Sequence, residues 1–309
     1  MNKPVITIVG SFAVGLTIRT ERMPVWGETL IGSDFNMGPG GKGSNQAIGT
    51  SRLGADSHFV GIIGSDKLGE IATNLYEQEG IHTSLLSVNF DHPTGAGLII
   101  LNQKGENFII LDMGANNLMD AAFVDRAEAQ IACSAIVMSV LEIPAAAAIR
   151  AMELGKKNGV RTLLNPAPAT PLDDEVFKYI DILTPNETEL RILLGLRADD
   201  PTPTYELAQQ LRDRGVQTVV VTMGAEGALV LRDEGAEIVP SIEVDVVDTT
   251  GAGDAFNSGL AVGLAEGHDL ITAVKMGNCA GALACTKLGV IPSLTDRATL
   301  ETLYARHFG

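Results

Sequence analysis

The sequence predicts an α/β protein: a Rossmann-like, mostly parallel sheet with helices on both faces, plus a small β-sheet lid. Short β-branched runs bounded by turn residues alternate with segments whose apolar residues recur at helical spacing. Such alternation is typical of a parallel sheet that is covered on both faces. Two segments, 13–36 and 94–111, interrupt the alternation with paired extended runs, and these predict the lid.

Six runs have the length and composition of buried strands: Val5–Val9, His58–Ile63, Ala135–Ser139, Thr162–Leu164, Ile180–Leu183 and Thr218–Thr222. Helical spacing is clearest in three segments between them: Lys67–Glu79, Ala145–Asn158 and Tyr205–Arg214. The C-terminal third predicts two long helices, Ala252–Ala265 and Asp269–Thr286. Both are rich in glycine and alanine, so we expect them to pack closely beside the sheet.

The two interrupting segments predict a small four-stranded sheet. Leu16–Thr20 and Thr29–Phe35 are joined by a turn around Pro24–Gly27. Ala96–Leu101 and Asn107–Leu111 are joined by Asn102–Gly105, a hairpin signal. We therefore expect residues 1–12, 37–93 and 112–309 to form the α/β body, and 13–36 and 94–111 the lid. A sheet this small must cover a substrate, another subunit or both.

Charge and cysteine content limit the possible partners and the compartment. The 309 residues carry a formal charge of −16, which repels nucleic acid and anionic membrane surfaces. Cys133, Cys279 and Cys285 form no CxxC pair, which favours reduced thiols in a cytoplasmic protein. The five histidines show no metal-ligand spacing, so no zinc site is expected. No window has the roughly 18 apolar residues of a membrane span.

The motif with the strongest chemical meaning is Asp248-Thr249-Thr250-Gly251-Ala252-Gly253-Asp254, directly before an apolar helical run. Glycines before a helix let several N–H groups point at one spot, where the helix N-terminus adds partial positive charge. This predicts an anion hole for a transferring phosphoryl group, with Asp254 as the base for an attacking hydroxyl. The alternative is a turn in which Asp254 only stabilises the helix end, and spacing alone does not decide.

A second glycine-rich motif, Gly38-Pro39-Gly40-Gly41-Lys42-Gly43-Ser44-Asn45-Gln46-Ala47, opens another helix. It is not a Walker A loop, because Gly43 follows Lys42 where serine or threonine is required. Lys42 and Asn45 in the first helical turn form a suitable platform for sugar hydroxyls. The alternative is a tight loop between the lid and the first helix.

Three further features follow predicted strands, where ligands of parallel sheets gather. Asn186 and Glu189 lie three residues apart and could reach a hydrated Mg²⁺, although a capping box explains the same pattern. The segment 222–227, Thr-Met-Gly-Ala-Glu-Gly, could hold a phosphate tail or be an ordinary turn between strands. Glu142 is a lone carboxylate at a strand end.

In this order, the motifs resemble the ribokinase family of carbohydrate kinases, the PfkB superfamily, over nearly the whole chain. The stretches that carry the resemblance are Gly10-Ser11, Gly40–Ala47, Asn165–Ala169, Thr184–Glu189 and Asp248–Asp254. The resemblance implies ATP-dependent phosphorylation of the primary hydroxyl of a small sugar, with Mg²⁺ and an activating K⁺. It also implies a cytoplasmic homodimer that pairs through the lid.

The resemblance assigns roles residue by residue. Asp254 is the catalytic base, and Gly251, Ala252 and Gly253 form the anion hole. The sugar site is lined by Gly41, Lys42, Asn45 and Glu142, with Asp254. The ATP phosphates are held by Asn186, Thr222, Gly224 and Gly227, with Asn278 near the adenine and Glu189 reaching Mg²⁺ through water. The K⁺ loops contain Asp248, Thr250, Ala284, Lys287, Gly289 and Ser293.

One departure affects the sugar. Ribokinases typically carry Asn and Asp in the first lid strand, where this chain has Ala13 and Gly15. Each lost hydrogen bond to a charged group could cost about 1.5–3 kcal/mol. Ribose or a ribose-like pentose is therefore a default substrate, and deoxyribose or a hexose stays open.

Two alternatives of other classes are weighed against the kinase. A non-catalytic sugar-sensing protein on the same fold would explain Ala13 and Gly15, but it has no use for a base beside an anion hole. A nicotinamide dehydrogenase would share the alternating architecture. The turn Val9–Gly15, however, lacks the GxGxxG pattern of dinucleotide binding.

Overall fold

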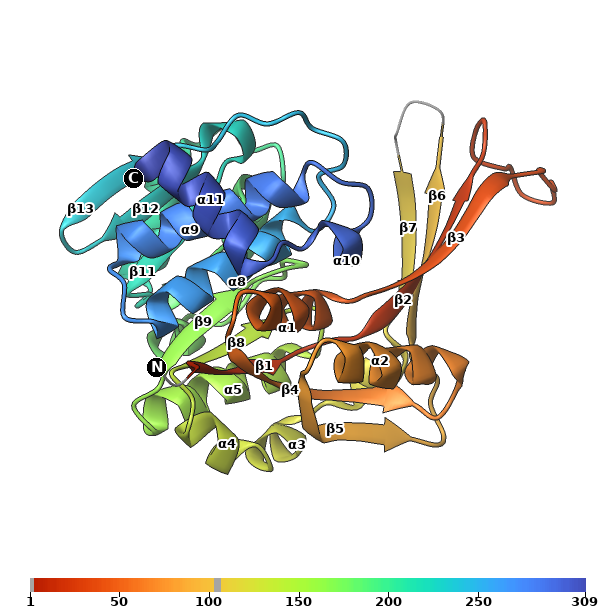
Figure 1. Cartoon of the computed structure of the whole chain (residues 1–309), viewed down its shortest axis with the longest axis horizontal. Coiled ribbons are helices and arrows are strands. Elements are labelled where there is room, and N and C mark those ends of the chain that lie inside the picture. Colours follow the sequence, from red (N-terminus) through yellow and green to blue (C-terminus); the bar gives the residue numbers. More distant parts are fainter. Residues whose placement is uncertain (1–2, 103–106) are drawn as a thin grey trace.

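The computed structural model describes residues 3–102 and 107–309, and in them a nine-stranded sheet forms the centre of the body (Figure 1). Its strand order is β13-β12-β11-β10-β9-β8-β1-β4-β5. The pairs from β5 to β11 are parallel, and β12 and β13 are added antiparallel at one edge. The strands are β1 Val5–Val9, β4 Asp56–Gly64, β5 His82–Asn89, β8 Ile136–Val140, β9 Arg161–Asn165, β10 Ile182–Leu183, β11 Thr218–Thr222, β12 Ala228–Arg232 and β13 Gly235–Val239.

Helices cover both faces of this sheet, as the sequence predicts. The longer helices are α1 Lys42–Arg52, α2 Lys67–Gln78, α5 Ala145–Lys157, α6 Glu187–Leu193, α7 Thr204–Asp213, α8 Ala252–Ala265, α9 Leu270–Ala284 and α11 Arg297–Phe308. Shorter ones are α3 Ala121–Asp125, α4 Glu128–Ala132 and α10 Val290–Ser293, with 3₁₀ turns η1 Gly114–Leu118, η2 Asp174–Tyr179 and η3 Gly224–Glu226. None of the helices in the described ranges is long and apolar enough to cross a membrane.

The alternation of side chains along each strand produces two separate cores. Ile6 and Ile8 of β1 join the cluster under α1, α8 and α9, whereas Val9 joins the cluster under α5. Successive strand side chains point to opposite faces, so one buried strand supplies both cores. The parallel ladder is thereby desolvated on both sides, and its polar carboxyl-terminal edge is left for a ligand.

The six predicted strands and the predicted helices are confirmed, with ends that agree within two residues. The sequence reading missed three strands, β5, β12 and β13. Of these, β5 and β13 are the two edge strands, each with one unpaired side, whereas β12 lies between β11 and β13. Edge strands can carry polar residues, so β5 and β13 lack a continuous apolar run.

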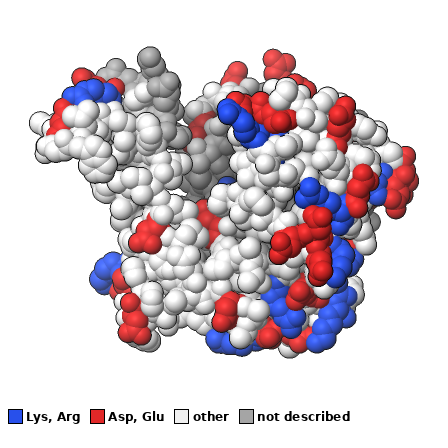
Figure 2. Space-filling view, turned by 180° about the vertical axis from the view of Figure 1, so that it is seen from behind, with Lys and Arg blue, Asp and Glu red and all other residues white. Residues whose placement is uncertain are grey.

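A second, four-stranded sheet projects from the body and forms the lid (Figure 1). Its order is β3-β2-β6-β7, with β2 Ala13–Arg19, β3 Ser33–Gly40, β6 Gly95–Leu101 and β7 Asn107–Asp112. The predicted second sheet is confirmed, as is the antiparallel pairing of β6 with β7. The expected turn Asn102–Gly105 lies mostly outside the described residues. Figure 2 shows a hollow between the lid and the body, and the lid surface in that view is largely uncharged away from its tip.

Two predicted lid strands were placed wrongly. β2 begins at Ala13 rather than Leu16, and β3 runs over Ser33–Gly40 rather than Thr29–Phe35. Glycine and proline have low strand propensity, so the sequence of Gly38–Gly40 favours a loop over a strand. Pairing of these residues with Ala13–Gly15 overrides that propensity. The turn near Pro24–Gly27 is confirmed by the bond from Glu28 N to Val25 O, 3.0 Å.

Helices α1 and α8 pack at a close seam beside the sheet. A Cβ atom added at Gly49 of α1 would lie 2.3 Å from Ser258 Oγ of α8. Ser258 Oγ donates to Asp254 O at 2.8 Å, within its own helix. Glycine at position 49 therefore lets the two backbones approach, and both glycine-rich motifs lie at the N-terminal ends of these helices.

Candidate active site

A cleft of about 180 Å³ lies at the carboxyl ends of β9, β10 and β11. It brings together residues from five separate stretches of the chain, as predicted for ligands of parallel sheets. The lining residues are Lys42, Asn165, Ala167, Thr184, Asn186, Glu189, Thr222, Thr249, Gly251, Gly253, Asp254 and Asn257. Both glycine-rich motifs thus reach one cleft, although about two hundred residues separate them.

Asp254 lies in the first turn of α8 and is only 5% exposed. Gly251 precedes the helix in a left-handed conformation, with φ 83°, and no side chain in the described part of the chain caps this helix end. Ala252 N donates to Thr249 O at 3.2 Å, and within the described residues no side chain caps the following N–H groups of the first turn, where the helix dipole adds positive charge. The local geometry fits a site for an anion next to a carboxylate.

The carboxylate of Asp254 is held by two amides from α1. Asn45 Nδ2 donates to Oδ2 at 2.8 Å, and Gln46 Nε2 donates to Oδ1 at 3.1 Å. The other ends of these amides, Asn45 Oδ1 and Gln46 Oε1, are buried and find no hydrogen-bond partner within residues 3–102 and 107–309. A buried polar atom without a partner costs about 1–3 kcal/mol, so a ligand that brings hydroxyl donors would bind favourably here.

A chain of hydrogen bonds extends from this pair along the floor of the cleft. Gln46 Nε2 also donates to Asn165 Oδ1 at 3.1 Å, and Thr184 Oγ1 donates to Asn257 Oδ1 at 2.6 Å. Asn165 Nδ2 and Asn257 Nδ2 donate to Thr184 O and Gly253 O. None of these four polar residues was assigned a site role from the sequence. Their only sequence signal is a place inside or beside the recognised motifs.

Lys42 is surrounded by three carboxylates. Its pKa is raised by Asp254 above all, and also by Glu142 and Glu189, although burial opposes the shift. The ammonium is therefore charged at neutral pH and partly balances the acidic residues of the cleft. The formal charge of −16 makes the chain as a whole repel anions, and Lys42 offsets this repulsion locally with a positive charge in the cleft.

Glu142 anchors the loop that carries Lys42. Its Oε2 accepts hydrogen bonds from Ser11 Oγ at 2.6 Å and from Lys42 N at 2.7 Å. Burial raises the pKa of Glu142, whereas the bonds from Ser11 and Lys42 lower it without cancelling the shift. Gly41 has φ 88°, and a Cβ there would lie 2.8 Å from Ala13 N, so glycine is required. Ser11 is a further residue that the sequence reading left without a role.

Asn186 and Glu189 form the capping box that the sequence left as an alternative. Asn186 Oδ1 accepts from Glu189 N, and Glu189 Oε2 accepts from Asn186 N, both at 2.8 Å. Both residues nevertheless line the cleft, so the box fixes their position at its edge. Burial raises the pKa of Glu189, and the bond from Asn186 N and the charge of Lys42 lower it only in part.

The pfkB family of carbohydrate kinases matches residues 4–297. The chain belongs to this family. The chain is 39% identical to ribokinase from Haemophilus influenzae, over 96% of this chain and 98% of that protein. It is 34% identical to deoxyribokinase from Salmonella typhi, over 92% and 93% of the two chains.

Solved structures agree with the sequence relatives. The Arabidopsis thaliana ribokinase complexed with ribose and ATP superimposes with a TM-score of 0.91 at 31% identity, over 98% of this chain and 99% of that one. Ribokinase from Thermotoga maritima gives a TM-score of 0.89 at 31% identity, over 98% and 99%. The predicted family, fold and enzyme class are thus confirmed: the protein is a carbohydrate kinase. The non-catalytic and dehydrogenase alternatives are set aside.

Of the residues expected to bind nucleotide in this pfkB kinase, three do not line the cleft: Gly224, Gly227 and Asn278. Thr222 lines the cleft and bridges to Asn186, whereas Gly224 and Gly227 lie in the turn between β11 and β12, with φ 55° and 99°. Asn278 is buried, and its Nδ2 donates to Val239 O and Pro240 O at 3.1 and 3.0 Å. Only the amide oxygen of Asn278 is left to meet a base.

The loops expected to surround K⁺ in this pfkB kinase are tied together by Asp248. Its Oδ1 accepts from Thr250 N and Oγ1, and its Oδ2 accepts from Gly289 N at 3.1 Å. Burial raises the pKa of Asp248, but these hydrogen bonds outweigh burial and lower it overall. Ser293 Oγ donates to Val290 O, and Lys287 N to Ala284 O, so both residues stabilise the second loop.

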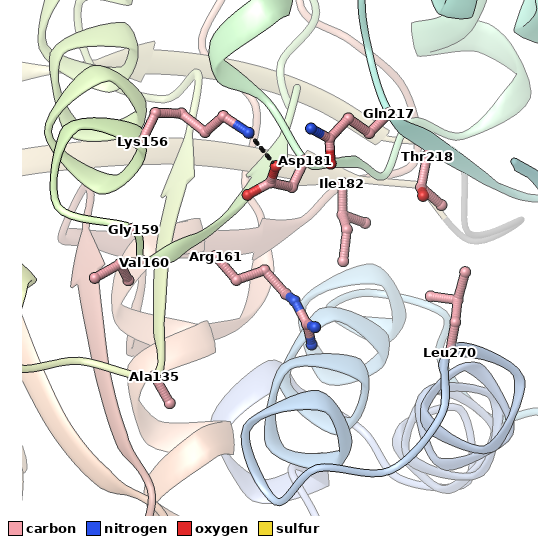
Figure 3. A pocket seen from close by; sticks show the side chains of 10 residues that line it. All are labelled: Ala135, Lys156, Gly159, Val160, Arg161, Asp181, Ile182, Gln217, Thr218 and Leu270. Carbon is pink, nitrogen blue, oxygen red and sulfur yellow. Dashed lines mark hydrogen bonds and ion pairs between the residues drawn. The ribbon is translucent and has the colours of Figure 1, made fainter. Parts of the chain in front are cut away.

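A larger cavity of about 610 Å³ lies at the opposite edge of the pfkB fold (Figure 3). Arg161, Ile182 and Thr218, the first residues of β9, β10 and β11, line it. Figure 3 shows Lys156 paired with Asp181 at one side, with Nζ and Oδ1 2.5 Å apart. None of the expected site residues lines this cavity, and it lies at the amino ends of the strands, away from Asp254.

Proposed function

We propose that this carbohydrate kinase transfers the γ-phosphoryl group of ATP to the primary hydroxyl of ribose or a ribose-like pentose. The observation that carries the proposal is the carboxylate of Asp254, held by Asn45 and Gln46 beside the uncapped end of α8. A base and an anion hole then meet in one cleft. The names of the Haemophilus influenzae and Arabidopsis thaliana relatives support ribose as the acceptor.

In the proposed reaction, Asp254 accepts the proton of the attacking hydroxyl. The N–H groups of Gly251, Ala252 and Gly253 stabilise charge on the transferring phosphoryl group. The neighbouring carboxylate of Asp254 raises the pKa of Lys42. Lys42 therefore adds a positive charge beside the base. Positioning and charge stabilisation account for the chemistry of such transfers, with no covalent enzyme intermediate.

The sugar site of the proposal consists of Gly41, Lys42, Asn45 and Glu142. The unpartnered oxygens Asn45 Oδ1 and Gln46 Oε1 supply acceptors for sugar hydroxyl donors. Glu142 supplies a further carboxylate, whose Oε1 forms no hydrogen bond with the described part of the chain. A polyol is the ligand class that satisfies several buried acceptors at once.

For the nucleotide, the proposal assigns the phosphates to Asn186, Thr222, Gly224 and Gly227, and the adenine side to Asn278. Glu189 has one carboxylate oxygen outside its capping box, so it would reach Mg²⁺ through water. Magnesium, when bound, neutralises charge on the ATP phosphates. K⁺ is proposed between the loops that Asp248 joins, with Thr250, Ala284, Lys287, Gly289 and Ser293 around it.

The identity of the sugar depends on the lid. Ala13 and Gly15 lie in β2 beside Gly40 and Gly38 of β3, so this part of the lid presents no polar side chain. A sugar hydroxyl facing it would find no side-chain partner, and this favours a deoxypentose as the second candidate. The 34% identity with the Salmonella typhi deoxyribokinase supports the same candidate.

The proposal also covers location and assembly. We place the protein in the cytoplasm, as its three free cysteines favour. We keep the division into body and lid, with β3 extending the lid segment to Gly40. Trp26, Phe35, Phe108 and Ile110 are largely exposed on the lid, with Trp26 wholly accessible. A monomer rarely leaves so many apolar side chains uncovered, and a homodimer through the lids would cover them.

The test is ADP release, measured with ribose, deoxyribose and a hexose, each with and without K⁺. We expect ribose or deoxyribose to give the highest kcat/KM and K⁺ to raise it. Release that is independent of every sugar would contradict the proposed acceptor class. Equal rates with and without K⁺ would remove the monovalent cation from the proposal but leave the sugar assignment in place.

A further inference from the structure

Two histidines that are distant in the sequence lie side by side at the amino end of the sheet, away from the catalytic cleft. Asp56 and His58 are two residues apart on β4, so both side chains point to the same face. His82 begins β5 and pairs directly with His58 in the parallel ladder. The pleat and the register therefore place all three side chains together, which the scattered histidine spacing did not indicate.

The three side chains are close enough to share one ion. Their ligand atoms all lie within 4.8 Å of one another, and in the described ranges 3–102 and 107–309 no other group of three such residues does so. His82 Nε2 lies 2.7 Å from Asp56 Oδ1, and His58 Nε2 lies 3.7 Å from Asp56 Oδ2. Two donors about 2.1 Å from a tetrahedral ion are roughly 3.4 Å apart, between these two separations.

The electrostatics also suit a cation. The two imidazole rings are stacked, with centroids 4.3 Å apart, so two protonated rings would repel each other across the stack. Asp56 supplies the negative charge, and His82 is half exposed, which leaves a path from solvent.

We propose that Asp56, His58 and His82 form a binding site for a divalent transition-metal ion such as Zn²⁺. Two imidazoles and one carboxylate are ligands that suit zinc, with water completing the coordination. The ion would take the place of the contact between His82 Nε2 and Asp56 Oδ1, which are 2.7 Å apart. It joins β4 to the edge strand β5. His58 Nδ1 has no partner in the described chain, so no outer acceptor orients this ligand, and we expect micromolar rather than tighter affinity.

The test is a calorimetric titration of the whole protein with ZnCl₂ in the absence of nucleotide. We expect one equivalent to bind with micromolar affinity. Loss of an outer partner alone costs about 10–100-fold in affinity, so His82→Ala should weaken this binding at least as much. His82 is half exposed at a strand end, so its replacement should leave the fold intact, and circular dichroism checks this.

The matched control is His268→Ala, because His268 pairs with a single carboxylate, Glu266, at 3.6 Å. This variant should bind Zn²⁺ as the natural sequence does. Copper(II) electron paramagnetic resonance gives a second readout: two coordinating nitrogens in the natural sequence, and one in His82→Ala. The proposal is overturned if no Zn²⁺ binds, if His82→Ala binds it unchanged, or if both variants weaken binding equally.

Discussion

Replacing Asp254 by asparagine separates catalysis from structure in this kinase. The carboxylate accepts from Asn45 Nδ2 and Gln46 Nε2, at 2.8 and 3.1 Å. An asparagine has the same shape, but its amide nitrogen would face one of these donors. Asn45 Oδ1 is unpartnered within the described residues, so rotation of the Asn45 amide restores a donor–acceptor pair and turns Nδ2 to the position of Oδ1, where a sugar hydroxyl can accept from it instead of donating.

The magnitudes follow from these contacts. With the hydrogen bonds restored, Asp254→Asn should change the free energy of unfolding by no more than about 1 kcal/mol. Asp254→Ala instead leaves two buried amide donors unpaired, at about 1–3 kcal/mol each. In both variants the base is lost, which lowers kcat about 10²–10⁴-fold, or about 3–5 kcal/mol of barrier.

The assays are ADP release for kcat, calorimetry for sugar binding and urea unfolding for stability. We expect Asp254→Asn to bind sugar nearly as the natural sequence does, while turnover falls at least a hundredfold. Turnover within tenfold of normal would refute the assignment of Asp254 as base. A loss of stability equal to that of Asp254→Ala would refute the rotation of the Asn45 amide.

Three other substitutions test separate parts of the site. Gly43→Ala would place a Cβ 2.6 Å from the backbone after β1 and should lower the free energy of unfolding by about 1–3 kcal/mol, whereas Gly38→Ala, with open space around it, should cost less in the same urea titration. Burial raises the pKa of Glu142 above its ordinary 4.5, so it gains a proton earlier as the pH falls; KM for the sugar should rise on acidification, and Glu142→Gln should remove that dependence. Introducing asparagine at Ala13 together with aspartate at Gly15 should lower KM for ribose relative to deoxyribose, and an unchanged ratio would show that the lid strand does not select the sugar.

The local features of the site could be predicted from the sequence. Both glycine-rich turns were recognised because glycine is the residue that tolerates the positive φ values found at Gly41 and Gly251. The capping box of Asn186 could also be predicted, because it is a local hydrogen-bond pattern with a fixed spacing of residues. Local patterns of this kind involve residues that are only a few positions apart in the sequence.

The contacts between motifs could not be read in this way. Gln46 and Asp254 are 208 residues apart, and only the packing of α1 on α8 brings them together. The same applies to His58 and His82, which meet because of strand register. The β3 strand was misplaced because its glycines and proline disfavour a strand, and pairing with β2 decides the outcome instead.

The close seam between α1 and α8 has a consequence for mutational scanning. The base belongs to one helix and its two amide partners to the other, so the interhelical spacing sets the alignment of the reacting groups. A methyl group at Gly49 would collide with Ser258 and force the helices apart. Misplacement by about 1 Å can cost a hundredfold in rate. Activity screens should therefore find inactivating substitutions along this helix contact, on residues that never meet either substrate.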